Sequence, residues 1–418
     1  MSQYKVTFVG DIMCERLLLK ASQQKRGGYD FSPVFANMQE LFSQADFVIG
    51  NLETPLAGEA AVYTNEMYSF NTPDTFADAV KQAGIDLVAI ANNHCLDRNV
   101  EGLCRTIRVL DDLGLPHCGT KVNGAQDQEA TYFSLGNTKF AVINYTYGTN
   151  YALNKMVLPE DSRVRVNLLR AQQESVYLKK NWSDVPKKRS FPSRVKRYIW
   201  SRIPEEQALK LKKLLKKPYN YARADDFLDT DTVAPYIEKM QSDIKTAKQK
   251  ADIVFFTPHI GGQFNLEPGA FSKYIVEKAY EAGCDAVIAS HAHVVQRAEL
   301  KNRVPCFYSL GNFSISPGSA YLLYDYLPDF GLAVHVYVDG AAIKKVTFSI
   351  LKMVENKKKM VMVYPVDDLY RSLLDEREKA LLSKNAAQIY STVTGKALEE
   401  GNVICREYVL VDYSMQGE

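Results

Sequence analysis

The sequence lacks any apolar segment long enough to cross a membrane, and it lacks a recognisable leader. Hydrophobic residues make up 46% of the 418 residues, but no run approaches the roughly 18 consecutive apolar residues of a membrane-spanning helix. The N-terminus, MSQYKVTFVGD, enters a strand-like run at once, without the apolar core and cleavage site of a signal peptide. We therefore expect a cytoplasmic protein, and a peripheral position at the inner face of the membrane stays open.

Paired cysteine motifs are also absent. The seven cysteines are scattered along the chain, and no two of them form a CxxC pair. An odd number without such pairs argues against a disulfide framework and against a zinc site made of thiolates. We expect reduced cysteines that lie mostly in the core.

Charge is nearly balanced at +2 overall, but it is unevenly distributed. Residues 179–217 hold far more Lys and Arg than Asp and Glu, so the rest of the chain is net acidic. A solvated helical excursion would explain this stretch. The sharper hypothesis is a surface for polyglutamate or an anionic membrane at residues 187–203, where Arg and Lys are interleaved with aliphatic and aromatic residues. No nucleic acid is expected, because no nucleic-acid motif accompanies the charge.

What the sequence does contain is a repeated pattern of helix, glycine and strand. Six runs of β-branched and apolar residues predict buried strands, at residues 5–11, 45–50, 85–91, 251–257, 284–290 and 304–313. Two of them follow helices that end at Gly84 and Gly283, and the first of these helices has Thr72 as a cap and Pro73 at its first position. After residue 355 we expect a strand, one helix over residues 368–393 and a last strand. This pattern is typical of layered α/β proteins.

Polar residues of one kind follow these strands. In open α/β sheets, ligands bind beyond the carboxyl ends of the strands, where distant segments meet. We therefore expect one site, formed by Asp11, Asn51, Glu53, Asn93, His94, His259, His291, His293 and Asn312.

Carboxylates, an amide oxygen and imidazoles together suit Mn, Fe or Zn, and two such ions would need about this many ligands. Alternation on an extended segment would point His291 and His293 the same way, so that each reaches a different ion. Taken alone, each residue has an ordinary structural explanation: Asp11 could cap a helix, and His94 could be a hydrogen-bonded structural histidine. The other two histidines, His117 and His335, fit packing or exposure better.

Six motifs in order carry a resemblance to a known family: VGDIM, GNLETPL, ANNHCLDRNVEGL with CGT, PHIGG, SHAHVVQ and YSLGNF. The chain resembles the CapA family, the poly-γ-glutamate capsule biosynthesis proteins of the calcineurin-like metallophosphatase superfamily, over residues 4–150 and 230–350. The resemblance implies a four-layer α/β/β/α sandwich of two mixed sheets with a metal site at one end. We expect a metallophosphatase-like domain over residues 1–354, a basic insertion at 155–230 and a small α/β extension at 355–418.

The resemblance also implies a role for each residue of the site. Asp11 and His293 would hold one ion, Glu53 would bridge, and the second ion would be held by Asn93, His259 and His291. His94 would protonate the leaving oxygen, and Asp97 would orient its imidazole from the same helical face. Contacts with substrate are expected from Asn51, Gln263 and Asn312.

Two positions depart from the pattern that the resemblance implies. Met13 stands where many metallophosphatases have a histidine, a change that CapA-like proteins share, so the first ion would be weakly held. After the fourth strand the family usually has His-Trp-Gly-x-Glu, whereas this chain has Ile260 for the aromatic and Gln263 for the acid. Both changes bear on whether catalysis is retained.

The function that the resemblance implies is metal-dependent hydrolysis, of the phosphoesterase type, in poly-γ-glutamate capsule or cell-envelope biosynthesis. Two divalent ions would generate a bridging hydroxide and clamp the reacting oxygens. The alternative from another class is a non-catalytic component that binds polyglutamate or supports export. A third reading is amide-bond chemistry on γ-linked glutamate, because such a hydroxide can also attack a carbonyl.

Overall fold

The structure is a computed structural model. It describes residues 3–122, 129–160, 162–173, 222–319, 326–398 and 404–414, together with Gln207. The predicted basic surface at residues 187–203 lies outside this part of the chain. Among the helices that are described, none is both long and apolar enough to cross a membrane.

Two large mixed sheets form the centre of the molecule. The first sheet has the strand order β16-β15-β14-β1-β2-β3-β4, with β17 also paired to β15. β1 lies between a parallel neighbour, β2, and an antiparallel one, β14. The strands are β1 (Gln3–Ile12), β2 (Phe47–Leu52), β3 (Leu87–Ala89), β4 (His117–Cys118), β14 (Phe330–Asp339), β15 (Ala342–Glu355), β16 (Val361–Pro365) and β17 (Tyr408–Asp412).

The second sheet has the order β12-β13-β10-β9-β7-β6, and β11 pairs with the end of β9. Its central pairs are parallel and its two edge pairs are antiparallel. The strands are β6 (Thr131–Leu135), β7 (Thr138–Thr146), β9 (Ile253–Ile260), β10 (Ala286–Ile288), β11 (Ser290–His291), β12 (Ala298–Lys301) and β13 (Val304–Phe307). A separate small ribbon joins β5 (Thr120–Val122) and β8 (Val164–Val166).

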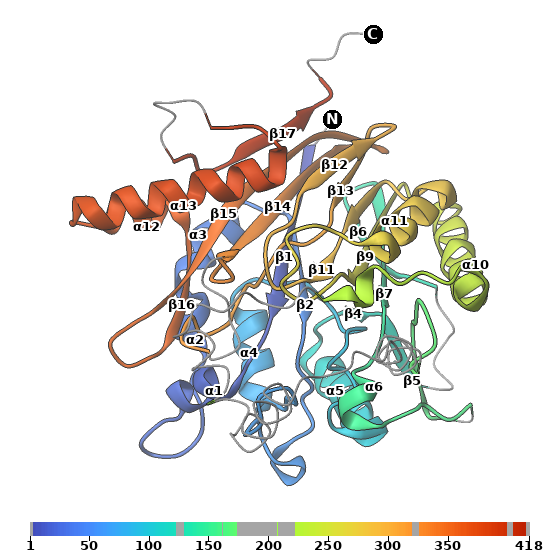
Figure 1. Cartoon of the computed structure of the whole chain (residues 1–418), viewed down its shortest axis with the longest axis horizontal. Helices are drawn as coiled ribbons and strands as arrows, with labels where there is room; N and C mark the ends of the chain where they lie inside the picture. The colour runs from blue at the N-terminus through green and yellow to red at the C-terminus, as the bar shows by residue number, and fades with distance from the viewer. Residues whose placement is uncertain are drawn as a thin grey trace, which may run out of the picture.

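Helices cover the outer face of each sheet. One core cluster joins the first sheet to α1 (Arg16–Ser22), α2 (Ser32–Phe35), α3 (Gln39–Ser43), α4 (Asp74–Gln82) and α5 (Asn99–Leu113). Another joins the second sheet to α10 (Thr230–Lys248) and α11 (Ala270–Ala282), which lie side by side at the right of Figure 1. Between the sheets lies a third cluster, in which Phe8 and Phe255 meet edge to face at 4.9 Å. The predicted four-layer α/β/β/α sandwich is confirmed.

The six predicted strands are all present, with ends shifted by a few residues. Gly84 and Gly283 follow α4 and α11 with φ of 97° and 93°, as their predicted left-handed positions require. The expected cap of α4 was wrong. Pro73 is the residue before the helix, and the Thr72 hydroxyl instead contacts that of Thr54 at 2.6 Å.

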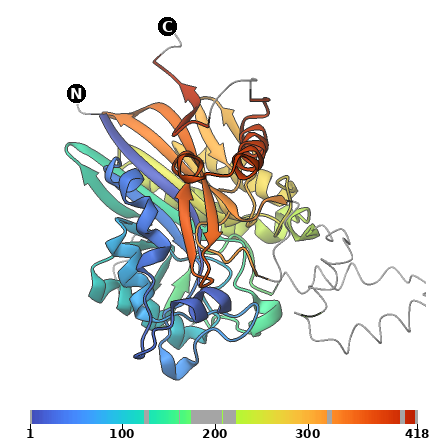
Figure 2. The same ribbon diagram turned by 90° about the vertical axis from the view of Figure 1, so that its left-hand side faces the viewer.

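The C-terminal residues extend the first sheet. β16 and β17 both pair with β15, and Figure 2 shows these orange and red strands on the same side of the molecule as the blue β1. The single helix predicted over residues 368–393 is instead two, α12 (Val366–Ser372) and α13 (Glu376–Thr394). The chain is extended at Leu373, and the Asp375 carboxylate then caps α13 by accepting from the Arg377 amide at 2.7 Å.

α13 closes one edge of the core between the sheets, because four of its side chains are buried in that cluster: Leu382, Ala386, Ile389 and Val393. Residues beyond 355 therefore contribute strands and core to the sandwich itself. The domain boundary at 354 stays a prediction.

Two interacting ionisable groups, the buried His335 and the half-buried Glu407, lie where β17 pairs with β15. His335 is fully buried, with its ring nitrogens against the hydroxyls of Thr7 at 2.9 Å and Ser349 at 3.0 Å. Burial, with the charge of Lys5, lowers the pKa of His335 from its ordinary 6.5 to about 3. Burial would raise the pKa of Glu407, but the charge of His335 and the hydrogen bond from Lys5 lower it from 4.5 to about 2.

We expect these two groups to make the fold acid-labile. The unfolded chain takes up protons at His335 below pH 6.5 and at Glu407 below pH 4.5, whereas the folded protein resists both until about pH 3 and 2. Stability therefore falls as the pH drops through this window. Urea unfolding at a series of pH values would show a shallower slope for His335→Gln between pH 6 and 4, by up to about 1.4 kcal/mol per pH unit for one proton. An unchanged slope would contradict this account.

Candidate metal centre

The polar residues predicted from the strand ends meet where the two sheets come together. Asp11 is paired with Asn51 between β1 and β2, and Ser290 with His259 between β11 and β9. An isolated bridge between Asp11 and Asn312 links the first strand to the segment after β13. The carboxyl ends of strands from both sheets thus deliver their side chains to one buried place.

Glu53 lies at the centre of this group. Its side chain is 0% exposed, and neither carboxylate oxygen has a hydrogen-bond partner within the described residues. Three imidazole Nε2 atoms face its Oε1 instead: His259 at 3.5 Å, His293 at 3.7 Å and His94 at 3.9 Å. An unpartnered buried carboxylate is costly. Its surroundings of nitrogen and oxygen donors therefore fit a site for divalent cations.

The ligand atoms form two groups that share Glu53. One is Glu53, His259 and His291, and the other is Asp11, Glu53 and His293, each with its ligand atoms within 4.8 Å of one another. Asn93 joins the first group, since its Oδ1 lies 2.7 Å from His259 Nε2. The structure therefore brings the six residues that were predicted as metal ligands together. With three or four protein ligands, a bound ion would keep positions for water or substrate.

Electrostatics differ between the two groups. Burial lowers the pKa of His291 well below its ordinary 6.5, and the charges of His259 and His293 add to the effect. For His293, burial is outweighed by the charge of Glu53 and the hydrogen bond to Asp11, so its pKa rises to about 9. His291 is thus a ready neutral ligand, whereas an ion bound by His293 must displace a proton.

Burial would also raise the pKa of Asp11, but the hydrogen bond and charge of His293, followed by the charge of His259, lower it below 3.8. The carboxylate is therefore ionised and available as a ligand over the whole physiological pH range.

The His94 imidazole is held at its Nδ1 atom by Asp97. Its Nδ1 lies 2.6 Å from Asp97 Oδ2, which also accepts from the Phe70 amide at 2.7 Å, and the Phe70 ring lies 4.3 Å from the imidazole. The predicted contact of His94 with Asp97 is present. The predicted helical face is not, because Asp97 closes a turn onto the His94 carbonyl at 3.0 Å and α5 begins only at Asn99.

The His291 and His293 pair differs from its predicted conformation. The two residues have φ of 110° and 56°, so the segment is not extended. This backbone, which is unfavourable for residues other than glycine, turns the two rings toward different partners: His259 for His291, and Asp11 for His293. Contact with two separate groups of ligands therefore comes from strained turns and not from alternation along a strand.

Two amides that were expected to contact substrate hold ligands in place. Asn51 donates to Asp11 Oδ1 at 2.8 Å and lies 3.3 Å from His259 Nδ1. Asn312 is fully buried, and its Oδ1 lies 2.9 Å from His293 Nδ1 while its Nδ2 donates to the His293 carbonyl at 3.0 Å. This contact leaves His293 Nε2 free to face Glu53. Gln263 is half-buried in the turn after β9, and its substrate contact stays a prediction.

Three further residues were not foreseen. Asn150, with φ of 53°, accepts from Asn93 Nδ2 at 3.2 Å and so points Asn93 Oδ1 toward His259. The Tyr147 ring lies 4.5 Å from that of His291, and the buried Arg170 donates to the Tyr147 carbonyl at 3.1 Å. Tyr147 and Asn150 follow β7, so the rule of polar residues after strands would have indicated them.

The chain is similar to known proteins over about three quarters of its length. Residues 5–316 match the sequence model of a family described as bacterial capsule synthesis protein PGA_cap. The chain belongs to this family. Similar curated proteins include the uncharacterized protein y4sH of Sinorhizobium fredii, 25% identical over 322 residues, a match that covers 74% of this chain and 66% of that protein.

Two capsule biosynthesis proteins are similar to this chain at slightly lower sequence identity. The PGA biosynthesis protein CapA of Bacillus subtilis is 22% identical over 75% of this chain and 63% of its own length. The capsule biosynthesis protein CapA of Bacillus anthracis is 23% identical over 75% and 60%. The chain therefore spans less than two thirds of the length of these relatives. Among solved structures, a 5'-nucleotidase from Candida albicans aligns with 94% of this chain and 59% of its own, at 10% identity and a TM-score of 0.39.

We expect His291→Ala to remove one ion from the PGA_cap protein while the fold persists. His291 contributes to only one of the two ligand groups, so the other group remains complete. Elemental analysis of protein exposed to Mn, Fe and Zn should fall from about two ions per chain to about one. His117→Ala, outside the centre, is the matched control. Undiminished metal in His291→Ala would argue against this assignment.

Asn312→Ala tests the support of His293. Loss of the contact to Nδ1 frees the imidazole to turn, so we expect metal affinity to fall by about 10–100-fold. Titration calorimetry with Mn²⁺ would measure the change. Asn137→Ala, on an exposed turn, is the control. Equal affinity of the two variants would show that Asn312 does not position the ligand.

Proposed function

We propose that this protein is a metal-dependent hydrolase of phosphoesters that acts in the synthesis of a capsule or another cell-envelope polymer. The observation that carries the proposal is the buried, unpartnered Glu53 carboxylate, which faces three imidazoles and is shared by two groups of metal ligands. Membership of the PGA_cap family supports the link to capsule synthesis. The name of the Bacillus subtilis relative, PGA biosynthesis protein CapA, supports poly-γ-glutamate as the polymer.

Two divalent ions, Mn, Fe or Zn, fit the donor set. Asp11, Glu53 and His293 would hold one, and Glu53 would share the other with Asn93, His259 and His291. When bound, such ions polarise a phosphoryl oxygen and lower the pKa of water. The group of Asp11, Glu53 and His293 has the fewer ligands and includes the proton-holding His293, so its ion would be the more weakly held.

His94 would supply the proton for the leaving oxygen. The Asp97 carboxylate fixes its Nδ1 at 2.6 Å, which leaves Nε2 directed toward Glu53 and the substrate side. From its imidazolium form His94 would donate at Nε2, and Asp97 would stabilise the charged ring and keep its orientation. This contact supports His94 and Asp97 as the pair for general acid catalysis.

A second candidate function is favoured by Met13. Its side chain is 1% exposed and packs in the core beneath the helices of the first sheet, so it offers no ligand to the first ion. Gln263 likewise brings no charge. A centre with one well-held ion would suit a component that binds polyglutamate without cleaving it. We rank two other proposals lower. They are binding of an anionic membrane through residues 187–203 and hydrolysis of γ-glutamyl amides.

Activity measurements separate these functions. With two ions bound, we expect hydrolysis of bis(p-nitrophenyl) phosphate or p-nitrophenyl phosphate. His94→Gln should lower kcat by about 10²–10⁴-fold, because general acid catalysis contributes that much, while the ion content stays constant. His117→Gln is the matched control. Retained ions with no cleavage of either phosphoester or of poly-γ-glutamate, but with binding of that polymer, would favour the second function.

A further inference from the structure

Tyr147 lies against the candidate metal centre, directly after β7. The centre of its ring is 4.5 Å from that of His291 and 6.4 Å from that of His259, two residues that were predicted as ligands of the same ion. His291 is only 3% exposed, whereas Tyr147 is half-buried, so part of the tyrosine reaches solvent beside a buried imidazole. Nothing in the proposed hydrolysis uses Tyr147.

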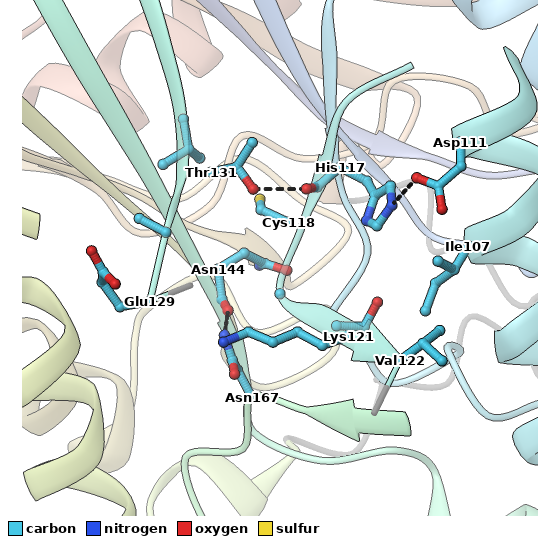
Figure 3. Close-up of a pocket in the computed structure, with 14 residues that line it drawn as sticks. Ile107, Asp111, His117, Cys118, Lys121, Val122, Glu129, Thr131, Asn144 and Asn167 are labelled. Carbon is cyan, nitrogen blue, oxygen red and sulfur yellow. Dashed lines mark hydrogen bonds and ion pairs between the residues drawn. The ribbon is translucent and has the colours of Figure 1, made fainter. Parts of the chain in front are cut away.

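Backbone contacts fix the position of Tyr147. Its amide donates to the His259 carbonyl at 3.0 Å, and its carbonyl accepts from Arg170 Nε at 3.1 Å. The segment before Arg170 is itself fixed to β7, because the Asn167 side chain donates to the Asn144 carbonyl at 3.0 Å (Figure 3). The backbone at Tyr147 is therefore held in place from both β9 and residues 167–170.

The ring of Tyr147 is also held. The Arg170 guanidinium lies 5.3 Å from its centre, within the range of a cation–π interaction, and 4.4 Å from the centre of the Phe271 ring. Arg170 is 2% exposed, so it cannot swing away into solvent. With a guanidinium and an imidazole as neighbours, the tyrosine side chain has little rotational freedom left to lose when a ligand binds.

The hydroxyl group of Tyr147 is available to a ligand. Within the described part of the chain this oxygen has no hydrogen-bond partner, and it is not sealed from solvent. Burial of the side chain raises the pKa of Tyr147, the charge of Arg170 opposes this change, and the charge of Glu53 adds to it. The hydroxyl therefore lies within electrostatic reach of the carboxylate that both ligand groups share. A protonated phenol can donate a hydrogen bond.

We propose that the Tyr147 hydroxyl contacts the substrate and donates a hydrogen bond to one of its phosphoryl oxygens. This inference rests on the proposed phosphoester hydrolysis and adds a catalytic residue to it. Negative charge on these oxygens is best stabilised by donors that are already fixed in place, because no reorganisation is then needed. A surface tyrosine would also have an open hydroxyl, but it would not be fixed at its amide, carbonyl and ring beside two candidate ligands.

The test compares the full chain with Tyr147→Phe, each loaded with Zn²⁺. This variant keeps the ring and removes a hydroxyl without a described hydrogen bond, so fold and ion content should not change. Calorimetry with inorganic phosphate should show binding weakened by about 10–100-fold, the effect of losing a hydrogen bond to a charged group. The kcat/KM for p-nitrophenyl phosphate should fall at least tenfold. Tyr370→Phe, half-buried on α12, is the matched control and should behave as the unaltered protein does.

Tyr147→Leu separates the hydroxyl from the ring. If Tyr147→Phe binds phosphate as the unaltered protein does and only Tyr147→Leu is impaired, the ring merely supports His291 and the proposal is overturned. Loss of ions from Tyr147→Phe, or no phosphate binding by the loaded unaltered protein, would also overturn it. Weaker phosphate binding by Tyr147→Phe, in a protein that cleaves no phosphoester, would support the contact and contradict the hydrolysis. Cleavage at equal rates by both would do the reverse.

Discussion

The structure depends on one buried negative charge, the Glu53 carboxylate, with imidazoles on three sides of it. A buried carboxylate without hydrogen bonds is costly unless a positive charge lies beside it. The charged His293 imidazole supplies one, and a bound divalent cation would displace its proton. Further contacts fix the orientations of the side chains around Glu53. Asn51 and Asn312 fix the orientations of Asp11 and His293, and Asp97 fixes His94.

Much of this could be read from the sequence because parallel strands end at a common edge. That rule alone brought Asp11, Glu53 and His259 into one site, although they come from two different sheets. It failed for backbone conformation. The extended form predicted for His291 and His293 was wrong because both residues have positive φ, a conformation that is uncommon outside glycine and that the strand-like pattern of the sequence does not indicate.

The networks of side-chain hydrogen bonds also could not be predicted from the sequence. The use of Asn312 as a support for His293, and of Asn150 as a support for Asn93, depends on rotamers that are set by packing. The two C-terminal helices were merged in the prediction because the polar and apolar periodicity continues across Leu373. The break is seen in the extended backbone at Leu373 and in the capping contact at Asp375.

The pairing of β1 with β14 has a consequence for biosynthesis. β1 (residues 3–12) pairs on one side with β14 (residues 330–339), which comes more than three hundred positions later in the chain. Asp11 also forms a bridge with Asn312. Closing so long a loop is slow. On the ribosome, the first strand of the chain must therefore wait with one edge unpaired until most of the protein has been made. The last of the six candidate metal ligands is His293, and its support Asn312 comes later still, so a chain interrupted before residue 293 lacks part of the ligand set.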